Sequence, residues 1–257
     1  MSWRGGDVGP WAQCVLAPNP GIMTLDGTNT WVVRVPGASR SVVVDPGPLD
    51  EGHLARVLAV GAPVGLVLIT HRHGDHTDGA RRFAELSGAP VRAVDPVHRT
   101  DAEGLTDAEV IDVDGLRLRV VATPGHTEDS VSFLMTDAGA LLSGDTVLGR
   151  GTTVVAHPDG ALGPYLTSLR RLLALAQTGA VAAIWPGHGP VIAEPAVVLA
   201  GYLAHREERL AQVRDAVASG ATTPRQVVEQ VYADVDTALW GAAELSVRAQ
   251  LAYLRAE

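Results

Sequence analysis

The 257-residue chain contains no lysine, a single cysteine and no long apolar run. Without lysine it cannot form a Schiff base, anchor pyridoxal phosphate or supply the lysine of a phosphate-binding loop. The one cysteine, Cys14, excludes an intramolecular disulfide and a cysteine-rich zinc site, so we expect a reducing, cytoplasmic setting. No stretch approaches the roughly 18 apolar residues of a membrane span, and the start of the chain lacks the pattern of a secretory signal.

The charge of the chain excludes further classes of partner. The formal net charge is −9, and all 20 basic residues are arginine. Such a protein is not drawn to nucleic acid or to anionic membranes as a whole, so we expect neither a membrane partner nor binding to double-stranded DNA. Positive charge at an active site must come from arginine or from a metal, and the nine histidines are the main source of chemistry.

The order of the predicted elements indicates an α/β protein with two sheets. Strands come mostly in consecutive groups with helices returning between them, which favours two sheets covered by helices over one alternating parallel sheet. The predicted strands are 30–35, 41–45, 65–70, 91–94, 116–122, 131–135, 140–143 and 181–185, and the predicted helices between them are 51–60, 78–87 and 164–176.

The last part of the chain, from residue 194, differs from the rest because only helices are predicted there. Helices are predicted over 194–218, 224–232 and 238–255, the second of them beginning at a proline in the favoured first turn, and no strand is predicted there. We therefore divide the chain into a main α/β domain, residues 1–200, and a small helical domain, residues 201–257.

A dense cluster of histidines follows an apolar predicted strand. His71 and His73 are two residues apart, so their side chains share one face of an extended segment. Gly74 permits a sharp turn that can bring Asp75 and His76 toward the same point. Imidazole and carboxylate are ligands that suit Zn²⁺ or a related first-row metal, so the cluster predicts a metal site.

Three other predicted strands are followed by side chains of the same kind, His126, Asp145 and His188. Taken singly, such residues commonly do no more than cap the next element. Together with the cluster they make seven candidate ligands, enough for two adjacent metals that share one bridging carboxylate.

The segment Thr-His-Arg-His-Gly-Asp-His at 70–76, followed in order by the three later ligands, resembles the metallo-β-lactamase superfamily. The resemblance covers about residues 15–200 and implies an αββα four-layer sandwich with the metals in a cleft at one sheet edge. It implies two ligand groups joined by a shared carboxylate: His71, His73 and His126 for the first metal, Asp75, His76 and His188 for the second, and Asp145 between them.

Asp45 ends an apolar strand and matches a strand-end aspartate of the family, which would orient a ligand from behind. A turn aspartate before Pro46 explains the spacing equally well. True lactamases of the superfamily depart from the Asp75–His76 pattern, which resembles the hydrolase branches instead, so we do not expect antibiotic hydrolysis.

Other motifs resemble the β-lactamase-like protein 2 subgroup. They are the segments 19–31 and 148–153, the turn 186–190 and the pair His205–Arg206. Members of that subgroup include a single-strand-specific endoribonuclease, and relatives release acyl chains from carrier proteins as thioesterases. Their C-terminal domain resembles a winged helix, and here we expect the helices with the wing absent or vestigial.

The resemblance implies a binuclear hydrolase that holds two Zn²⁺ ions, with Mn²⁺ or Fe as alternatives, and uses a bridging hydroxide. Asp75 and Asp145 are the carboxylates best placed to accept or pass on its proton. Asn29 could donate to a developing oxyanion, although a turn role explains it better. His205 and Arg206 could bind a phosphate or carboxylate, and a solvated helix start explains them equally well.

The substrate class stays open at this point. The subgroup favours phosphodiester cleavage in single-stranded RNA, whereas residues 201–257 carry six arginines and eight acidic residues, which is no basic footprint. Thioester hydrolysis, of the acyl-carrier or glyoxalase II type, suits an acidic protein. A non-hydrolytic metal-binding protein is a third interpretation, and the complete ligand set argues against it. The apolar helix near the C-terminus could pack on its own domain or form a homodimer.

Overall fold

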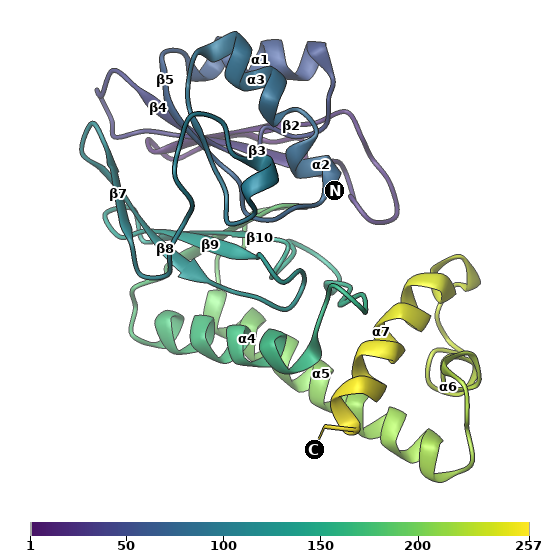
Figure 1. Ribbon diagram of the computed structural model, residues 1–257. Helices are drawn as coiled ribbons and strands as arrows, with labels where there is room; N and C mark the ends of the chain where they lie inside the picture. Colours follow the sequence, from purple (N-terminus) through teal and green to yellow (C-terminus); the bar gives the residue numbers. More distant parts are fainter. Residues whose placement is uncertain (1, 257) are drawn as a thin grey trace.

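The computed structural model describes residues 2–256 and consists of two stacked β-sheets with helices on both outer faces (Figure 1). The first sheet has six strands in spatial order, β1 (Gly6–Val8), β2 (Ala12–Leu16), β3 (Asn29–Val33), β4 (Ser41–Val44), β5 (Val64–Leu68) and β6 (Val91–Arg92). The second sheet has the order β11-β10-β9-β8-β7 and contains β7 (Val110–Val113), β8 (Leu116–Ala122), β9 (Val131–Met135), β10 (Ala140–Gly144) and β11 (Ala183–Pro186). Both sheets are mixed, because β4, β5 and β6 pair in parallel, as do β10 and β11.

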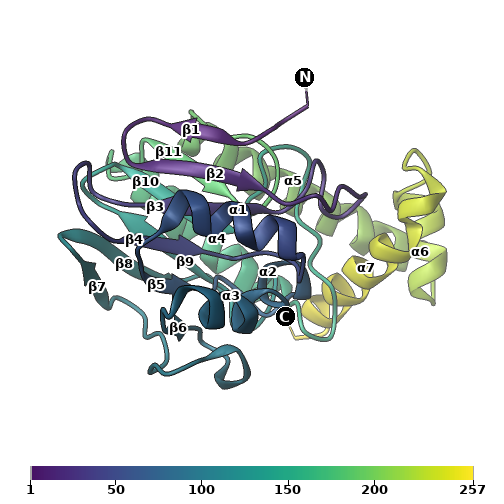
Figure 2. The ribbon, with the colours of Figure 1, turned by 90° about the horizontal axis from the view of Figure 1, so that it is seen from above.

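Helices from different parts of the chain cover the two sheets. Those over the first sheet are α1 (Glu51–Gly61) and α3 (Ala80–Ser87), with the short α2 (Gly74–Thr77) beside them (Figure 2). Those over the second sheet are α4 (Leu162–Gln177) and α5 (Pro195–Ala218), while α6 (Pro224–Val231) and α7 (Trp240–Leu254) stand to one side (Figure 1). Short 3-10 turns are η1 (Pro96–His98) and η2 (Thr237–Leu239). The predicted αββα layering is confirmed.

Three apolar layers hold the sheets and helices together. Between the sheets, Trp31 from β3 stacks on Trp185 from β11 with their ring centroids 5.3 Å apart. Phe83 of α3 is completely buried on the first sheet, as Leu169 of α4 is on the second. Strands such as β4 and β10 are therefore buried on both faces, which is why they read as continuous apolar segments.

The predicted strands correspond to β3–β6 and β8–β11 with small shifts at their ends. Three further strands, β1, β2 and β7, were not predicted from the sequence. The first two lie among glycines, and β2 includes Gln13 and Cys14, which weakens its apolar pattern. β7 is an edge strand that alternates exposed and buried side chains and contains Asp112, a residue type that strands disfavour.

Helix α5 passes through residue 200, where the sequence analysis divided the chain. Leu199 and Tyr202 pack into the apolar layer beneath the second sheet. Farther along the same helix, Val213 packs with Val227 of α6 and Val247 of α7. One helix thus belongs to both parts of the chain, so no linker separates them.

The C-terminal part is helical, as its periodicity predicted. The helices expected over 194–218, 224–232 and 238–255 correspond to α5, α6 and α7, and no strand follows β11 within residues 2–256. Helix α6 begins with a capping box formed by Thr223 and Gln226. Over the described part of the chain, no helix is both long and apolar enough to span a bilayer.

Candidate metal centre

The predicted ligands lie in turns that follow four strands at one edge of the sandwich. His71 follows β5, His126 follows β8, Asp145 follows β10 directly and His188 follows β11. Backbone hydrogen bonds hold these turns together. The amide of Gly187 donates to the carbonyl of Gly144 at 2.8 Å, and an amide of β9 donates to the carbonyl before His71. The turns of both sheets therefore meet at this edge.

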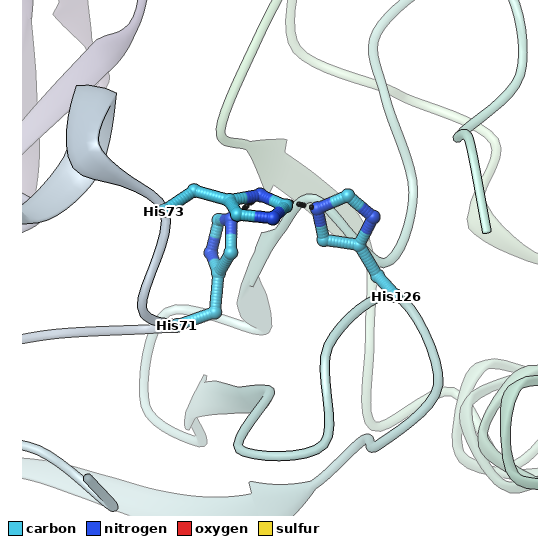
Figure 3. Close-up of side chains that lie close together, drawn as sticks. All are labelled: His71, His73 and His126. Atoms are coloured by element: carbon cyan, nitrogen blue, oxygen red, sulfur yellow. Dashed lines mark hydrogen bonds between the residues drawn. The ribbon is translucent and has the colours of Figure 1, made fainter. Parts of the chain in front are cut away.

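The first three histidines converge on one point (Figure 3). Nδ1 of His73 lies 3.1 Å from Nε2 of His71 and 3.0 Å from Nε2 of His126. His71 and His126 are buried and His73 is partly exposed, and the three rings meet edge to face. Three nitrogens from two distant segments thus form a compact group at which one metal ion can bind.

A second group lies beside the first. Nε2 of His188 is 3.2 Å from Oδ2 of Asp75 and 3.3 Å from Nε2 of His76. Asp145 lies between the groups, since its Oδ2 is 3.2 Å from Nε2 of His188 and 3.7 Å from Nε2 of His126. The structure therefore brings all seven predicted ligands together, with one carboxylate placed between two sets of three.

The donor atoms fit a cation. Neighbouring ring nitrogens about 3 Å apart repel through their lone pairs unless a proton or a metal lies between them. Oδ1 of Asp145 is buried and has no hydrogen-bond partner among residues 2–256, which is costly for a carboxylate oxygen unless a cation contacts it. These groups, in this fold, form a metal centre.

The protonation states of the donors agree with metal binding. Burial, reinforced by the charge of His76, holds the pKa of His71 well below 6.5, so its ring is neutral and offers a lone pair. Burial disfavours charge on Asp145, but His188 and His76 outweigh it and keep the pKa of this carboxyl below 3.8. The same histidines hold the pKa of Asp75 below its usual range.

Residues behind the ligands fix their orientation. Oδ2 of Asp45 lies 2.8 Å from Nδ1 of His76, which turns Nε2 of that ring toward the centre. Thr70 donates to both oxygens of Asp45 from its amide and hydroxyl groups. Thr28 donates to Oδ2 of Asp75 at 2.8 Å. Asp45 therefore holds a predicted ligand from behind, and Thr28 holds another.

Asn29 is not the oxyanion donor that the sequence allowed, because its amide group is used inside the protein. Its side chain is fully buried, and Nδ2 donates to the carbonyls of Pro186 and Gly189 at 2.9 Å each. Its Oδ1 accepts from Nε1 of Trp3. Both amide hydrogens are therefore used to hold the turn that carries His188, and neither is left for a substrate.

An ion pair that was not predicted from the sequence joins the loop of His71 and His73 to the loop of His126. Arg72 points away from its histidine neighbours, and its Nε donates to Oδ1 of Asp129 at 3.2 Å. Asp129 is buried and also accepts from the hydroxyl of Thr127 in the loop of His126. This pairing joins the two segments that form the first histidine group. The position of Arg72 between two histidines does not predict this ion pair, because Asp129 lies far away in the sequence.

A cavity of about 270 Å³ opens beside the metal centre, with His126 and Asp145 in its wall. The rest of the wall is mainly apolar, and its large apolar residues are Ile22, Met23, Leu25, Leu148 and Leu239. Arg150 also lines this cavity but pairs with Asp26. The space next to the donors is therefore shaped for an apolar group.

The pair His205–Arg206 lies inside α5 and does not line the cavity that holds His126 and Asp145. Arg206 is 7% exposed, donates to the carbonyl of Thr153 and lies over the Tyr165 ring at 5.2 Å from its centroid. His205 is partly exposed. Neither residue is the solvated helix start that the sequence also allowed.

Comparison with known proteins agrees with the fold and the donor set. Residues 23–188 match the Metallo-beta-lactamase superfamily, and residues 223–257 match the Beta-lactamase associated winged helix domain. The first match covers more than half of the chain. The chain therefore belongs to the metallo-β-lactamase superfamily, and it is a metal-dependent hydrolase.

The chain is also similar to individual proteins that have names or solved structures. The chain is 34% identical over 233 residues to a "Beta-lactamase-like protein 2 homolog" of Caenorhabditis elegans, covering 86% of this chain and 76% of the relative. It is 33% identical over 240 residues to an "Atrochrysone carboxyl ACP thioesterase" of Aspergillus fumigatus, covering 85% and 72% of the two chains. A solved beta-lactamase domain protein from Burkholderia ambifaria has a TM-score of 0.81 at 22% identity and covers 100% of this chain and 90% of its own.

Proposed function

We propose that the protein hydrolyses thioesters of apolar acyl groups at a centre of two divalent metals. The apolar cavity against His126 and Asp145 carries this proposal. An acyl chain gains about 0.8 kcal/mol for each methylene that it buries there, and its carbonyl would then lie at the donor groups. The similarity to a named acyl carrier protein thioesterase supports the same substrate class.

The donor geometry supports two metals, with His71, His73 and His126 around one, Asp75, His76 and His188 around the other, and Asp145 shared. Nitrogen and carboxylate donors suit Zn²⁺ first, with Mn²⁺ or Fe as alternatives. When bound, two such ions polarise the scissile carbonyl and supply hydroxide at neutral pH.

The two carboxylates of the centre are proposed to act differently. The side chain of Asp75 is 27% exposed and that of Asp145 is 10% exposed, so Asp75 is the one that a leaving thiolate can reach. Thr28 already donates to Oδ2 of Asp75 and fixes its orientation. We assign proton transfer to Asp75, whose carboxylate would accept the proton of the attacking water and pass it to the leaving thiolate, and a mainly structural, charge-balancing role to Asp145.

Cleavage of single-stranded RNA, the first expectation from sequence, is the less favoured substrate class. The cavity directly against the metal centre is mainly apolar and its arginine, Arg150, pairs with Asp26, so the nucleotides next to a scissile phosphodiester would meet apolar walls there. A cytoplasmic location and a homodimer also stay predictions.

The test is thiol release from octanoyl-N-acetylcysteamine, a neutral thioester, by protein loaded with Zn²⁺ or Mn²⁺. We expect metal-dependent release that falls at least about 100-fold in Asp75→Ala. Asp78→Ala is the matched control, because Asp78 is an exposed aspartate of the same loop. End-labelled single-stranded RNA is the second substrate. Cleavage of RNA without thiol release, or full activity in Asp75→Ala, would contradict the proposal.

A further inference from the structure

A second cavity, of about 200 Å³, lies between the segment after β10 and the C-terminal helices. It shares Thr152, Thr153, Val154 and Leu239 with the wall of the acyl cavity, so the two spaces adjoin. Figure 1 shows the segment between β10 and α4 passing beside α7. A molecule bound at the metal centre can therefore extend into the second cavity.

Three basic side chains of α5 line the second cavity, His205, Arg206 and Arg209. Arg206 is 93% removed from solvent, and its buried Nε has no hydrogen-bond partner in the described part of the chain. Within residues 2–256 neither Arg206 nor Arg209 forms an ion pair with a carboxylate. A buried, unpaired guanidinium is costly, and one carbonyl and one aromatic face offset only part of that cost.

Two neighbouring side chains, His205 and Arg209, add hydrogen-bonding groups to the wall of this cavity. Nδ1 of His205 is buried without a partner among the residues described. Burial and the charge of Arg206 lower the pKa of His205, so the ring is a neutral hydrogen-bonding group. Arg209 lies over the Tyr232 ring at 4.8 Å, and its Nη1 donates to the carbonyl of Val231. Stacking holds this guanidinium at the cavity while other N–H groups stay free to donate.

We propose that the second cavity binds an anionic group, a phosphate or a carboxylate, carried by the same thioester whose acyl chain lies beside the metal centre. This assignment rests on the proposed function. Guanidinium groups recognise both oxyanions through charge-assisted hydrogen bonds, and an anion in this cavity would balance the charges of Arg206 and Arg209, which no carboxylate of residues 2–256 pairs with. The substrate class is therefore an amphipathic thioester with an apolar acyl chain and one anionic end.

The test measures binding to the metal-loaded protein by calorimetry, so it does not depend on turnover. The probes are three thioethers that cannot be hydrolysed: octyl-N-acetylcysteamine, which is neutral; octyl-coenzyme A, which carries phosphates on the thiol side; and octyl-N-acetylcysteamine with a carboxylate at the end of the octyl chain. We expect one of the two anionic probes to bind about tenfold more tightly than the neutral probe. The probe that does so distinguishes phosphate from carboxylate.

The variants Arg206→Gln and Arg209→Gln are expected to remove this preference and to leave binding of the neutral probe unchanged. Arg209→Gln decides the matter if the buried Arg206 variant fails to fold. Arg225→Gln is the matched control, because Arg225 also lies over an aromatic ring, that of Trp240 at 4.6 Å, but does not line the cavity.

Two failures are distinguishable. Equal binding of all three probes by the wild-type protein, or the same loss in Arg225→Gln as in Arg209→Gln, would overturn the anion site even if thioesters are hydrolysed. A preference for an anionic probe that Arg209→Gln removes, in a protein that releases no thiol from any thioester, would overturn the proposed function and leave the anion site standing.

Discussion

Asp45 and His76 are joined by a hydrogen bond of 2.8 Å between Oδ2 and Nδ1, in the layer directly behind the metal centre. Asp45 has a φ of 53°, a left-handed conformation that is uncommon outside glycine. Two hydrogen bonds from Thr70 hold its carboxylate in that position. The left-handed backbone at Asp45 therefore places the carboxylate that directs Nε2 of His76 toward the metal centre.

Asp45→Asn should weaken metal binding more than it weakens folding. Asparagine has one accepting oxygen where Asp45 uses two, so either the Thr70 amide or Nδ1 of His76 faces an NH2 group and the ring is held less firmly. We expect the affinity for the weaker of the two metals to fall about 10- to 100-fold, measured by competition with a chromophoric chelator. Asp78→Asn, which changes an exposed aspartate nearby, should bind metal like the wild type. Unchanged affinity in Asp45→Asn would show that Asp45 does not orient His76.

Gly125→Ala should disturb the first metal group through the backbone. Gly125 precedes His126, has a φ of 135°, and a Cβ there would lie 2.3 Å from Cα of Tyr165. We expect the free energy of unfolding to drop by more than about 2 kcal/mol, measured by urea titration, together with weaker metal binding. Gly37→Ala is the control that separates the backbone strain of a positive φ from the steric clash with Tyr165. Gly37 also has a positive φ, but nothing lies within 4 Å of its Cβ position. Equal losses in both variants would contradict this account.

The donor set could be predicted from the sequence because every ligand follows a strand. His71 follows a strand of the first sheet and His188 follows a strand of the second, so the strand ends alone did not place them together, and the resemblance to the superfamily did. The same resemblance placed Asp45 behind them, since its position before Pro46 fits a turn aspartate equally well. The main layers followed from the grouping of strands, whereas the edge strands β1 and β7 were lost because an edge needs few apolar residues.

Pairings between distant loops could not be predicted. Asn29 uses its amide on the turn at Pro186, and Arg72 uses its guanidinium on Asp129, and no local pattern records either partner. The cavity has the same character, because its wall joins Ile22 and Leu239 from opposite ends of the chain. Such contacts depend on how helices, strands and loops pack against one another once they have formed. Hydrophobic periodicity predicts the helices and strands but not this packing.

Leu239→Ala should reduce the preference for long acyl chains. Leu239 lines both cavities, so its loss removes apolar surface along the path of the chain. We expect kcat/KM for octanoyl-N-acetylcysteamine to fall about 5- to 20-fold while that for the acetyl thioester stays within about twofold. Leu245→Ala is the control on the same part of the chain, because Leu245 is 40% exposed and lines neither cavity. A parallel fall for both thioesters would place the acyl chain elsewhere.

The stability of the protein should depend on pH through His53, a fully buried residue of α1 whose Nε2 lies 2.9 Å from Oγ1 of Thr30. Burial, with the nearby charge of Arg56, lowers the pKa of His53 from 6.5 to about 4. Between these values the unfolded chain binds a proton that the folded chain does not. The free energy of unfolding is therefore highest above pH 6.5. It falls by up to about 3 kcal/mol as the pH drops toward about 4, because only the unfolded chain takes up the proton on His53.

Urea titrations of the wild type and His53→Gln at about pH 7.5 and about pH 4.5 measure this effect. Glutamine keeps an amide near Thr30 but does not titrate, so the variant should lose less stability on acidification than the wild type. Protonation of the metal-binding histidines acts equally on both proteins, and the difference between them therefore isolates His53. His98→Gln, in the partly exposed turn η1, should follow the wild-type curve. If His53→Gln follows that curve as well, His53 is not the group that couples folding to pH.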